Sequence, residues 1–292
     1  MIASELGCLR REMRITRLSE GVDASATLLP AALARTYEVL GEYRDLMDEY
    51  GVGRGLLVAT SAVRDASNGR EFLDAAHTIT GVEGRILSGA EEAAYSYDGA
   101  SADLQSDDRA TLVVDIGGGS TEMAVQLNGK LFSFSMQLGC VRVTERALGR
   151  EVVTPQSAAA ARTMINAELD RAWAAVPQFD SVVGRVRMVG LAGTVATLAQ
   201  LDAGLDAYDR DVVHHRKLSR HTVAQWRDRL AGESPAARLA RPGMVAGRED
   251  VLAAGLFVLD AVMERFGVSE LVSSESDILD GIVAALCRDR SA

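Results

Sequence analysis

TLVVDIGGGSTEMAV, residues 111–125, is the most informative stretch of this 292-residue chain. Its apolar run at 112–114 predicts a buried strand, and the residues from Glu122 onward predict a second strand after three glycines. Glycine allows a backbone to approach a ligand closely and to direct several N–H groups at it, and such amide nests bind phosphate oxygens. The stretch therefore predicts a hairpin whose tip holds a phosphate group.

Two carboxylates, Asp115 and Glu122, flank the glycine bend. Carboxylate oxygens are hard ligands suited to Mg²⁺, which commonly accompanies phosphates. The simpler alternative is a tight hairpin in which Asp115 only helps to form the turn. Three successive glycines between two acids exceed what a turn requires, so we interpret the stretch as a phosphate and metal site.

Other nucleotide-binding motifs are absent from the sequence. No G-x-x-x-x-G-K-[ST] motif occurs, and Lys130 and Lys217 are the only lysines, which excludes a P-loop. Glu122 occupies the position where a G-x-G-x-x-G motif would need its last glycine. The sequence therefore predicts a phosphate-binding hairpin and not a phosphate-binding loop that opens a helix.

The composition predicts a sizeable core organised as two lobes, because 48% of the residues are hydrophobic. The longest apolar run, 251–259, is far too short to span a bilayer, so we expect no membrane partner. The three cysteines, Cys8, Cys140 and Cys287, form no C-x-x-C motif. They indicate buried or inert thiols in a reducing compartment, hence the cytoplasm.

The net charge of −10 argues against nonspecific binding to DNA or other nucleic acids, which depends on the release of many counterions. It is compatible with a polyanion held in a local basic groove. Two clusters could form such a groove: Arg10, Arg11, Arg14 and Arg17, and His214, His215, Arg216, Lys217, Arg220 and His221. The alternative is that both clusters are solvated faces.

A second candidate binding segment follows the apolar run 55–60, which predicts a buried strand. Thr60, Ser61 and Arg64 come at its end, where open α/β sheets bind ligands. Arg64 could form a forked pair of hydrogen bonds with a phosphate. Equally, it could be a surface arginine paired with Asp65.

Two adjacent acids, Glu91 and Glu92, open a predicted helix. Ser88 and Glu91 have the spacing of a capping box, which gives Glu91 a structural role. Glu92 has no such role and is free to orient or deprotonate a water. Its alternative is a solvated acid on the helix surface.

A predicted strand at 187–191 ends in Ala192, Gly193 and Thr194. An apolar strand, small residues and then a helix N-terminus can receive a phosphate or ribose oxygen. A simple Gly-Thr helix cap explains the same residues.

The order of predicted elements suggests a doubled α/β unit. Residues from 111 onward predict three strands, and then helices and strands alternate to the end of the chain. The first lobe begins at what would be its third strand, predicted at 13–18, so its opening hairpin is missing. We expect an α/β fold of two lobes with a cleft between them.

The sequence resembles the Ppx/GppA phosphatase family, which comprises exopolyphosphatases and guanosine pentaphosphate phosphohydrolases. The resemblance runs from Arg10 to Ala285 and rests on five blocks, of which the third is the most specific: 59–65 (ATSAVRD), 88–93 (SGAEEA), 114–122 (VDIGGGSTE), 190–194 (GLAGT) and 247–251 (GREDV). It implies the duplicated ribonuclease-H-like fold shared with actin, Hsp70 and sugar kinases. The expected lobes are residues 1–90 with 278–292, and residues 91–277.

The resemblance also implies a mechanism, in which Mg²⁺ or another hard divalent cation assists the removal of a terminal phosphoryl group by water. Glu92 matches the catalytic base, and Arg64 matches a phosphate-binding residue of the catalytic centre. Asp115 and Glu122 match the positions that support the metal. The remaining positions assigned to phosphate binding are Gly117, Gly118, Gly119, Ser120, Thr121, Thr60, Ser61, Gly193 and Thr194. These roles agree with phosphoryl transfer, which needs mainly positioning and charge neutralisation.

One departure from the family concerns the first lobe, where the motif D-x-G-[ST]-N is missing. Either the start lies upstream, or the chain is a degenerate member. We expect an exopolyphosphatase, with guanosine pentaphosphate (pppGpp) hydrolysis as the close alternative. From another class, the chain could be a catalytically impaired regulator that binds phosphate or a nucleotide such as (p)ppGpp. A sugar or acetate kinase fits less well, and a homodimer is expected from the resemblance alone.

Overall fold

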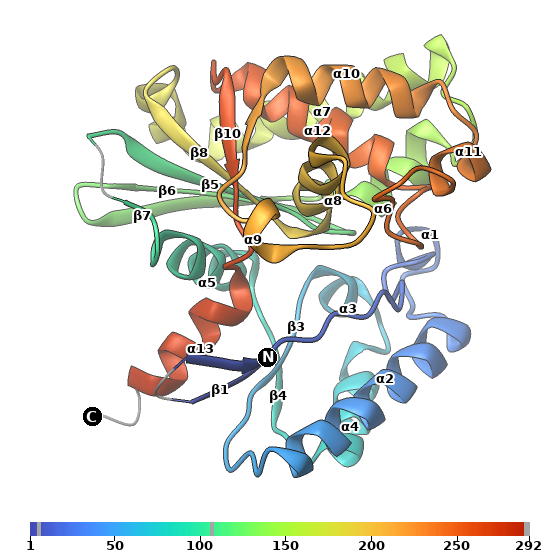
Figure 1. Ribbon diagram of the computed structural model, residues 1–292, viewed down its shortest axis with the longest axis vertical. Helices are drawn as coiled ribbons and strands as arrows, with labels where there is room; N and C mark the ends of the chain where they lie inside the picture. The colour runs from blue at the N-terminus through green and yellow to red at the C-terminus, as the bar shows by residue number, and fades with distance from the viewer. Residues whose placement is uncertain (5–6, 106–107, 289–292) are drawn as a thin grey trace. The chain divides into compact units, whose positions relative to one another are not determined.

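The computed structural model describes residues 1–4, 7–105 and 108–288 (Figure 1). It divides into two compact units. The first unit comprises Met1–Glu91 with Ala285–Ala292, and the second unit comprises Glu92–Ala284. The boundaries expected from the sequence lie at 90/91 and 277/278.

The first unit contains two small sheets and four helices among its described residues up to position 88. β1 pairs antiparallel with β2, and β3 pairs parallel with β4. The tyrosine and phenylalanine rings of Tyr37 and Phe72 stack between the two longer helices, with centroids 5.9 Å apart. The elements are β1 (Ile2–Ser4), β2 (Gly7–Arg10), α1 (Val22–Ser25), α2 (Pro30–Glu49), β3 (Leu57–Ala59), α3 (Ser61–Asp65), α4 (Gly69–Thr80) and β4 (Gly84–Ile86).

The strand predicted at 13–18 is wrong. Residues 11–17 have no regular secondary structure, and Arg17 has a φ of 54°, in the left-handed region that a strand does not use. Apolar and polar residues alternate there although the segment is only partly buried and forms no strand. The strand predicted at 55–60 is confirmed, because β3 occupies its centre, but only Ala59 of β3 is fully buried.

The second unit is built on a six-stranded sheet of order β7-β6-β5-β8-β10-β9. β5, β6 and β7 form an antiparallel meander, while β5, β8 and β10 run parallel to one another. This order agrees with the mixed α/β unit expected from the sequence. The strands are β5 (Ala110–Ile116), β6 (Thr121–Leu127), β7 (Lys130–Met136), β8 (Val186–Leu191), β9 (Lys217–Ser219) and β10 (Glu270–Ser273).

Helices cover both faces of this sheet, as Figure 1 shows. Alternate residues of β5 point to opposite faces, so Leu112 and Val114 join the large core while Val113 faces α5. The helices are α5 (Gly89–Ser101), α6 (Cys140–Val143), a π-helix (Thr144–Leu148), α7 (Pro155–Ala175), a 3₁₀-helix (Pro177–Val182), α8 (Ala192–Ala203), α9 (Arg210–Val213), α10 (Arg220–Ala231), α11 (Pro235–Leu239), α12 (Leu252–Arg265) and α13 (Ile278–Arg288).

Two glycines allow α5 and the start of α13 to lie in close contact. A Cβ at Gly99 would overlap the carbonyl of Asp277, and a Cβ at Gly281 would overlap the carbonyl of Tyr95. Only glycine permits such an approach of two backbones. The turn before α13 is therefore fixed against α5.

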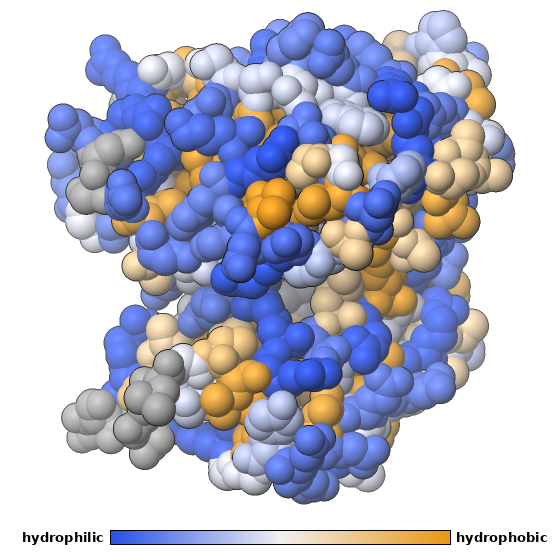
Figure 2. Space-filling model, viewed as in Figure 1, coloured by the Kyte–Doolittle hydropathy of each residue, from blue (hydrophilic) through white to orange (hydrophobic). Residues whose placement is uncertain are grey.

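No helix in the described part of the chain is long and apolar enough to cross a membrane. Hydrophilic residues cover most of the face drawn in Figure 2 and interrupt the hydrophobic ones. The described cysteines are free: Cys140 is buried, but Cys8 and Cys287 are exposed, so the expectation of buried thiols holds for only one of the three. Burial raises the pKa of the Cys140 thiol, which makes it a poor nucleophile.

Candidate functional site

Asp115 and Glu122 lie directly opposite each other in the β5–β6 ladder, and Glu122 lies opposite Ser135 of β7. All three side chains therefore point to the face of the sheet that α5 covers. The Ser96 hydroxyl on α5 donates to Asp115 Oδ2 at 2.8 Å, and the Ser135 hydroxyl donates to Glu122 Oε1 at 2.6 Å. The hairpin predicted from the sequence thus presents two carboxylates side by side, each held by serine hydroxyls.

Burial and mutual repulsion perturb both carboxylates. Burial raises the pKa of Asp115 to about 7; the hydrogen bond from Ser96 lowers it in part, and the charges of Asp277 and Glu92 raise it further. Burial also raises the pKa of Glu122 well above its usual range, and the charges of Glu92 and Asp115 raise it further. Several acids are therefore confined where their negative charges are poorly compensated by the protein.

The carbonyl groups of the glycine bend point into the protein. The Gly117 carbonyl accepts a hydrogen bond from Cys140 N at 2.9 Å, and the Gly118 carbonyl accepts one from Val141 N at 3.0 Å. The Gly119 carbonyl accepts a hydrogen bond from Arg142 Nε at 2.8 Å, and Arg142 is buried. The first turn of α6 and one arginine therefore fix the path of the bend.

The amide groups of the bend have no such partners. No described residue accepts a hydrogen bond from the backbone N–H of Gly118, Gly119 or Ser120. Successive unpaired amides in a bend form a nest for an anion. A Cβ at Gly139 would overlap Gly118, so this fourth glycine lets α6 support the bend from behind. The sequence analysis missed Gly139 and Arg142 as parts of this arrangement.

The second predicted turn lies beside the hairpin. β5 and β8 are parallel, with Asp115 in register with Leu191, so both strands end at the same edge of the sheet. Ala192 has a φ of 62°, a strained conformation for a residue with a side chain. A Cβ at Gly193 would collide with the guanidinium group of Arg248, so this glycine makes room for the arginine.

Arg248 is the residue of this site to which the sequence analysis assigned no role. No described residue forms a hydrogen bond or a close ion pair with its guanidinium group. Burial lowers the pKa of Arg248, which shows that the charge is poorly compensated by the protein. A partly buried cation that forms no close ion pair with a protein anion is suited to bind a ligand anion. Arg248 lies in the block 247–251 (GREDV), so the family resemblance was a signal that could have identified it.

Glu91 has the capping role that the sequence predicts, and Glu92 lies in a different environment. Ser88 N donates to Glu91 Oε2 at 2.8 Å, and Glu91 N donates to Ser88 Oγ at 3.2 Å, which confirms the capping box. The Ser88 N–H lowers the pKa of Glu91. Glu92, by contrast, is only 7% exposed and its charge acts on Asp115 and Glu122. The alternative of a solvated helix acid is therefore wrong for Glu92.

Three predicted hydroxyl ligands have partners within the protein. The Thr121 hydroxyl donates to the carbonyl of Leu138, and the Ser120 hydroxyl bonds the Glu122 carboxylate. Thr194 is 2% exposed and its side chain contacts Gly255 of α12. Direct phosphate contacts from these hydroxyls stay predictions, while the backbone amide of Ser120 belongs to the nest described above.

Thr60, Ser61 and Arg64 belong to the first unit and are described within it. Thr60 precedes α3, and Ser61 is the buried first residue of that helix. Arg64 Nη1 donates to the carbonyl of Leu87 at 2.7 Å, just before the Ser88 capping box. Arg64 therefore steadies the segment that leads into α5, and its role toward phosphate stays a prediction.

The donor set of the hairpin suits a hard divalent cation. Asp115 and Glu122 are paired carboxylates whose repulsion a cation would relieve, and Mg²⁺ is often held by one or two carboxylates together with substrate phosphates. The described residues contain one group of three His, Cys, Asp or Glu side chains whose ligand atoms all lie within 4.8 Å of one another, and it is elsewhere: Asp103, His214 and His215. The hairpin therefore fits a cation shared with the substrate better than a cage made of protein ligands alone.

Comparison with known proteins agrees with this geometry. The sequence model of the Ppx/GppA phosphatase family matches residues 2–288. The chain belongs to the Ppx/GppA phosphatase family. It is therefore an enzyme of the hydrolase class, as the sequence analysis expects.

Relatives in the Ppx/GppA family carry two names. The chain is 37% identical to exopolyphosphatase 2 of Mycobacterium tuberculosis over 291 residues, covering 97% of this chain and 90% of the relative. It is 27% identical to the guanosine-5'-triphosphate,3'-diphosphate pyrophosphatase of Aeromonas salmonicida, of which it spans 58%.

Solved structures confirm the fold. An exopolyphosphatase-like protein has a TM-score of 0.91 at 32% identity, covering 98% of this chain and 91% of that one. The Ppx/GppA family member of Aquifex aeolicus has a TM-score of 0.77 at 27% identity, covering 96% of this chain and 89% of that one. The predicted fold class is thus confirmed.

Proposed function

We propose that this protein is an exopolyphosphatase, which hydrolyses the terminal phosphoanhydride bond of inorganic polyphosphate and releases orthophosphate. The observation that carries the proposal is the hairpin, where unpaired amides of Gly118 to Ser120 lie next to the paired carboxylates of Asp115 and Glu122. The 37% identity to an exopolyphosphatase supports polyphosphate as the substrate.

Two kinds of groups around the bend are proposed to bind the phosphate: backbone amides and an arginine. The backbone amides of Gly118, Gly119 and Ser120 donate hydrogen bonds to the oxygens of the terminal phosphoryl group. Arg248, whose guanidinium group lies against Gly193, supplies a positive charge for the same chain of anions. Fixed donors of this kind stabilise the charge that spreads over the phosphoryl oxygens in the transition state.

Glu92 is the proposed base for the attacking water. The water oxygen forms a bond to the terminal phosphorus, its proton passes to the Glu92 carboxylate, and the bond to the bridging oxygen breaks. The shortened polyphosphate leaves with that oxygen. Glu92 is only 7% exposed and its charge acts on both Asp115 and Glu122, which supports a role close to the hairpin.

Asp115 and Glu122 are the residues that would hold Mg²⁺ or a similar divalent cation. When bound, the cation would neutralise phosphate charge and polarise the phosphoryl oxygens. Ser96 and Ser135 orient the two carboxylates through their hydrogen bonds. Binding of a cation would explain why two acids occupy positions where they repel each other.

The remaining predicted residues are proposed to assist phosphate binding: Arg64, Thr60, Ser61, Thr121, Gly193 and Thr194. Arg64 is included because its guanidinium group has the forked donor geometry that matches a phosphate. We further propose that the protein acts in the cytoplasm, with polyphosphate or (p)ppGpp as its partner, and that it forms a homodimer.

A side-by-side assay tests the proposed substrate. Phosphate release from long-chain polyphosphate and from guanosine pentaphosphate should be measured with the same protein, with Mg²⁺ and with EDTA. We expect a higher kcat/KM for polyphosphate and loss of activity in EDTA. A higher kcat/KM for the nucleotide would instead assign the pentaphosphate hydrolase activity, which the 27% identical relative favours. Binding of either ligand without phosphate release would indicate a regulator.

A further inference from the structure

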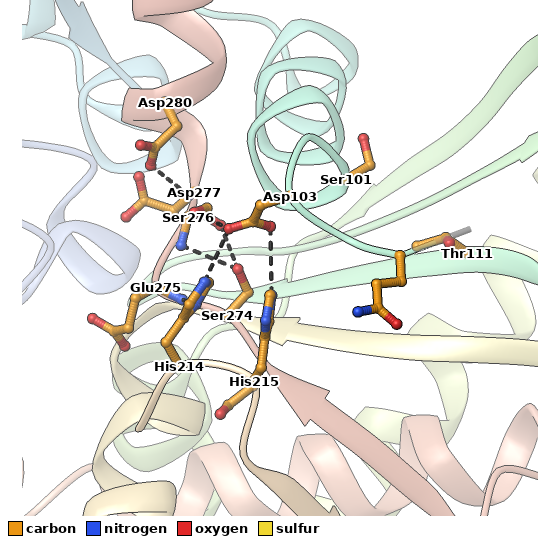
Figure 3. Close-up of polar contacts among 12 residues, drawn as sticks. Ser101, Asp103, Thr111, His214, His215, Ser274, Glu275, Ser276, Asp277 and Asp280 are labelled. Atoms are coloured by element: carbon orange, nitrogen blue, oxygen red, sulfur yellow. Dashed lines mark hydrogen bonds and ion pairs between the residues drawn. The ribbon is translucent and has the colours of Figure 1, made fainter. Parts of the chain in front are cut away.

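A second polar cluster of the second unit lies around the carboxylate of Asp103 (Figure 3). Asp103 Oδ2 is 2.9 Å from His214 Nε2 and accepts a hydrogen bond from Ser276 Oγ at 2.9 Å, while Oδ1 is 3.4 Å from His215 Nε2. The two imidazole rings are stacked, with centroids 3.8 Å apart. Three segments that are far apart in the sequence therefore meet at one carboxylate.

The hydrogen bonds of His214 identify the position of its proton. Glu275 N donates to His214 Nδ1 at 3.0 Å, and a ring nitrogen that accepts a hydrogen bond carries no proton. The proton of the neutral ring is therefore on Nε2, where it is donated to Asp103. Burial lowers the pKa of His214, as do His215 and Arg210, and Asp103 only partly opposes this effect. The neutral ring is thus the favoured form at neutral pH.

The same hydrogen bond argues against a metal at this cluster. The spacing of the three ligand atoms would suit zinc or a similar ion. A histidine that binds a metal through Nε2 normally carries a proton on Nδ1 and donates it to an acceptor. Here Nδ1 faces the N–H of Glu275, so metal binding through Nε2 would bring two N–H groups together. The geometry therefore favours a proton over a metal ion.

The cluster connects two segments that contribute to the hairpin site. Asp103 follows α5, the helix that carries Glu92 and Ser96. Ser276 precedes Asp277, whose charge raises the pKa of Asp115 and whose carbonyl packs against Gly99 of α5. The Ser276 hydroxyl and the His214 ring thus attach the turn at 274–277 to the end of α5.

We propose that His214 is a positioning residue, which holds the turn at 274–277, and with it Asp277, in place only while its ring is neutral. Protonation of Nδ1 would remove the acceptor of the Glu275 N–H and place two donors against each other. The acidic and basic groups that face the ring are Asp103, His215 and Arg210; the Glu275 carboxylate is held by the Tyr208 hydroxyl. The turn is therefore expected to loosen as the pH falls.

We call the attachment of the turn at 274–277 by neutral His214 the clamp. Measurements that need no substrate test whether the clamp exists. Nitrogen NMR of the imidazoles should show His214 protonated on Nε2 at pH 8, and the Glu275 amide should exchange at least ten-fold faster, relative to its intrinsic rate, at pH 5.5 than at pH 8. His214→Gln should abolish this pH step. His221→Gln, on the exposed side of α10, is the matched control and should keep it. Three results would contradict the clamp. These are a proton on Nδ1 of His214 at pH 8, displacement of the Nε2 proton by added Zn²⁺, and hydrogen-exchange protection of the Glu275 amide that does not change with pH.

The effect of His214 protonation on the hairpin site rests on the proposed function, and it is measured separately through the pH dependence of phosphate release. The kcat for phosphate release from polyphosphate should fall more steeply between pH 7.5 and 5.5 in the wild type than in His214→Gln, while KM changes little. Identical profiles for both proteins would refute the positioning role even if the clamp exists. Failure of the proposed function would show separately, as the absence of phosphate release by the wild type at every pH.

Discussion

The carboxylates of Asp115 and Glu122 oppose each other as a direct cross-strand pair, at the point where β5 and β6 meet the glycine bend. Like charges in this position destabilise a sheet, and burial adds to the cost. The serines that bond the two acids reduce this cost only in part, because the pKa of both groups is still raised. A cation or a proton is therefore needed to stabilise the hairpin.

The stability of the metal-free protein should depend on the ionisation of Asp115. Its carboxyl has a pKa of 3.8 when unperturbed and of about 7 in the folded protein, so its contribution is complete below pH 3.8 and is lost as the pH rises through about 7. Asp115→Asn should therefore stabilise the protein in EDTA at pH 8, by on the order of a few kcal/mol, and less at pH 5. Urea unfolding at both pH values measures the difference. Asp170→Asn, which removes an exposed ion pair with Arg265, should show no such change with pH.

Mg²⁺ should raise the thermal stability of the wild type at pH 8 because it neutralises the paired carboxylates. The double variant Asp115→Asn, Glu122→Gln should lose most of this response. A thermal shift assay with millimolar Mg²⁺ measures it, and the Asp170→Asn protein serves again as the control. An equal response of the double variant and the wild type would place the cation elsewhere.

Glu92→Gln should reduce kcat for phosphate release by roughly 10²- to 10⁴-fold, because a positioned general base is lost while the size of the side chain is kept. KM should change little. Glu91→Gln is the matched control, since the neighbouring acid serves as a helix cap and glutamine can replace it there. Unchanged turnover in Glu92→Gln would show that another group activates the water.

Arg248→Met should raise KM for polyphosphate by about 10- to 100-fold, the effect of losing one charge-assisted hydrogen bond to an anion. Arg248→Lys should recover part of the loss, because it keeps the charge but not the fork. Arg171→Met, which removes an exposed arginine paired with Glu168, should leave KM unchanged. Equal KM values for all three variants would exclude Arg248 from substrate binding.

Gly139→Ala should disturb the glycine bend, because the added methyl group would overlap Gly118. We expect a loss of about 1 to 3 kcal/mol in the free energy of unfolding, together with weaker phosphate binding. Gly41→Ala provides a contrast: no atom lies within 4 Å of its added Cβ, and α2 should gain about 0.5 to 1 kcal/mol. Urea unfolding and calorimetric binding of phosphate would measure both effects. A Gly139→Ala protein as stable as the wild type would show that α6 can move away from the bend.

Local sequence patterns predicted the hairpin, the capping box of Ser88 and Glu91, and the strand β8, but not the short edge strand β9. These features depend on neighbouring residues: period-two alternation, glycine in a bend, and a three-residue cap spacing. The strand predicted at 13–18 failed because alternation alone does not distinguish a paired strand from an extended segment. In the structure residues 11–17 form no strand, and Arg17 has a left-handed φ that a strand does not use.

The sequence by itself determined the family of this protein and the position of its hairpin, because the triple glycine between Asp115 and Glu122 is a specific local pattern. Only the tertiary structure showed that Arg248 lies against Gly193, that Arg142 and Gly139 support the bend, and that Asp103 meets two histidines. These contacts join segments that are tens of residues apart in the chain, and their existence depends on how helices pack against the sheet. Packing of that kind leaves no periodic trace in the sequence, so it has to be observed.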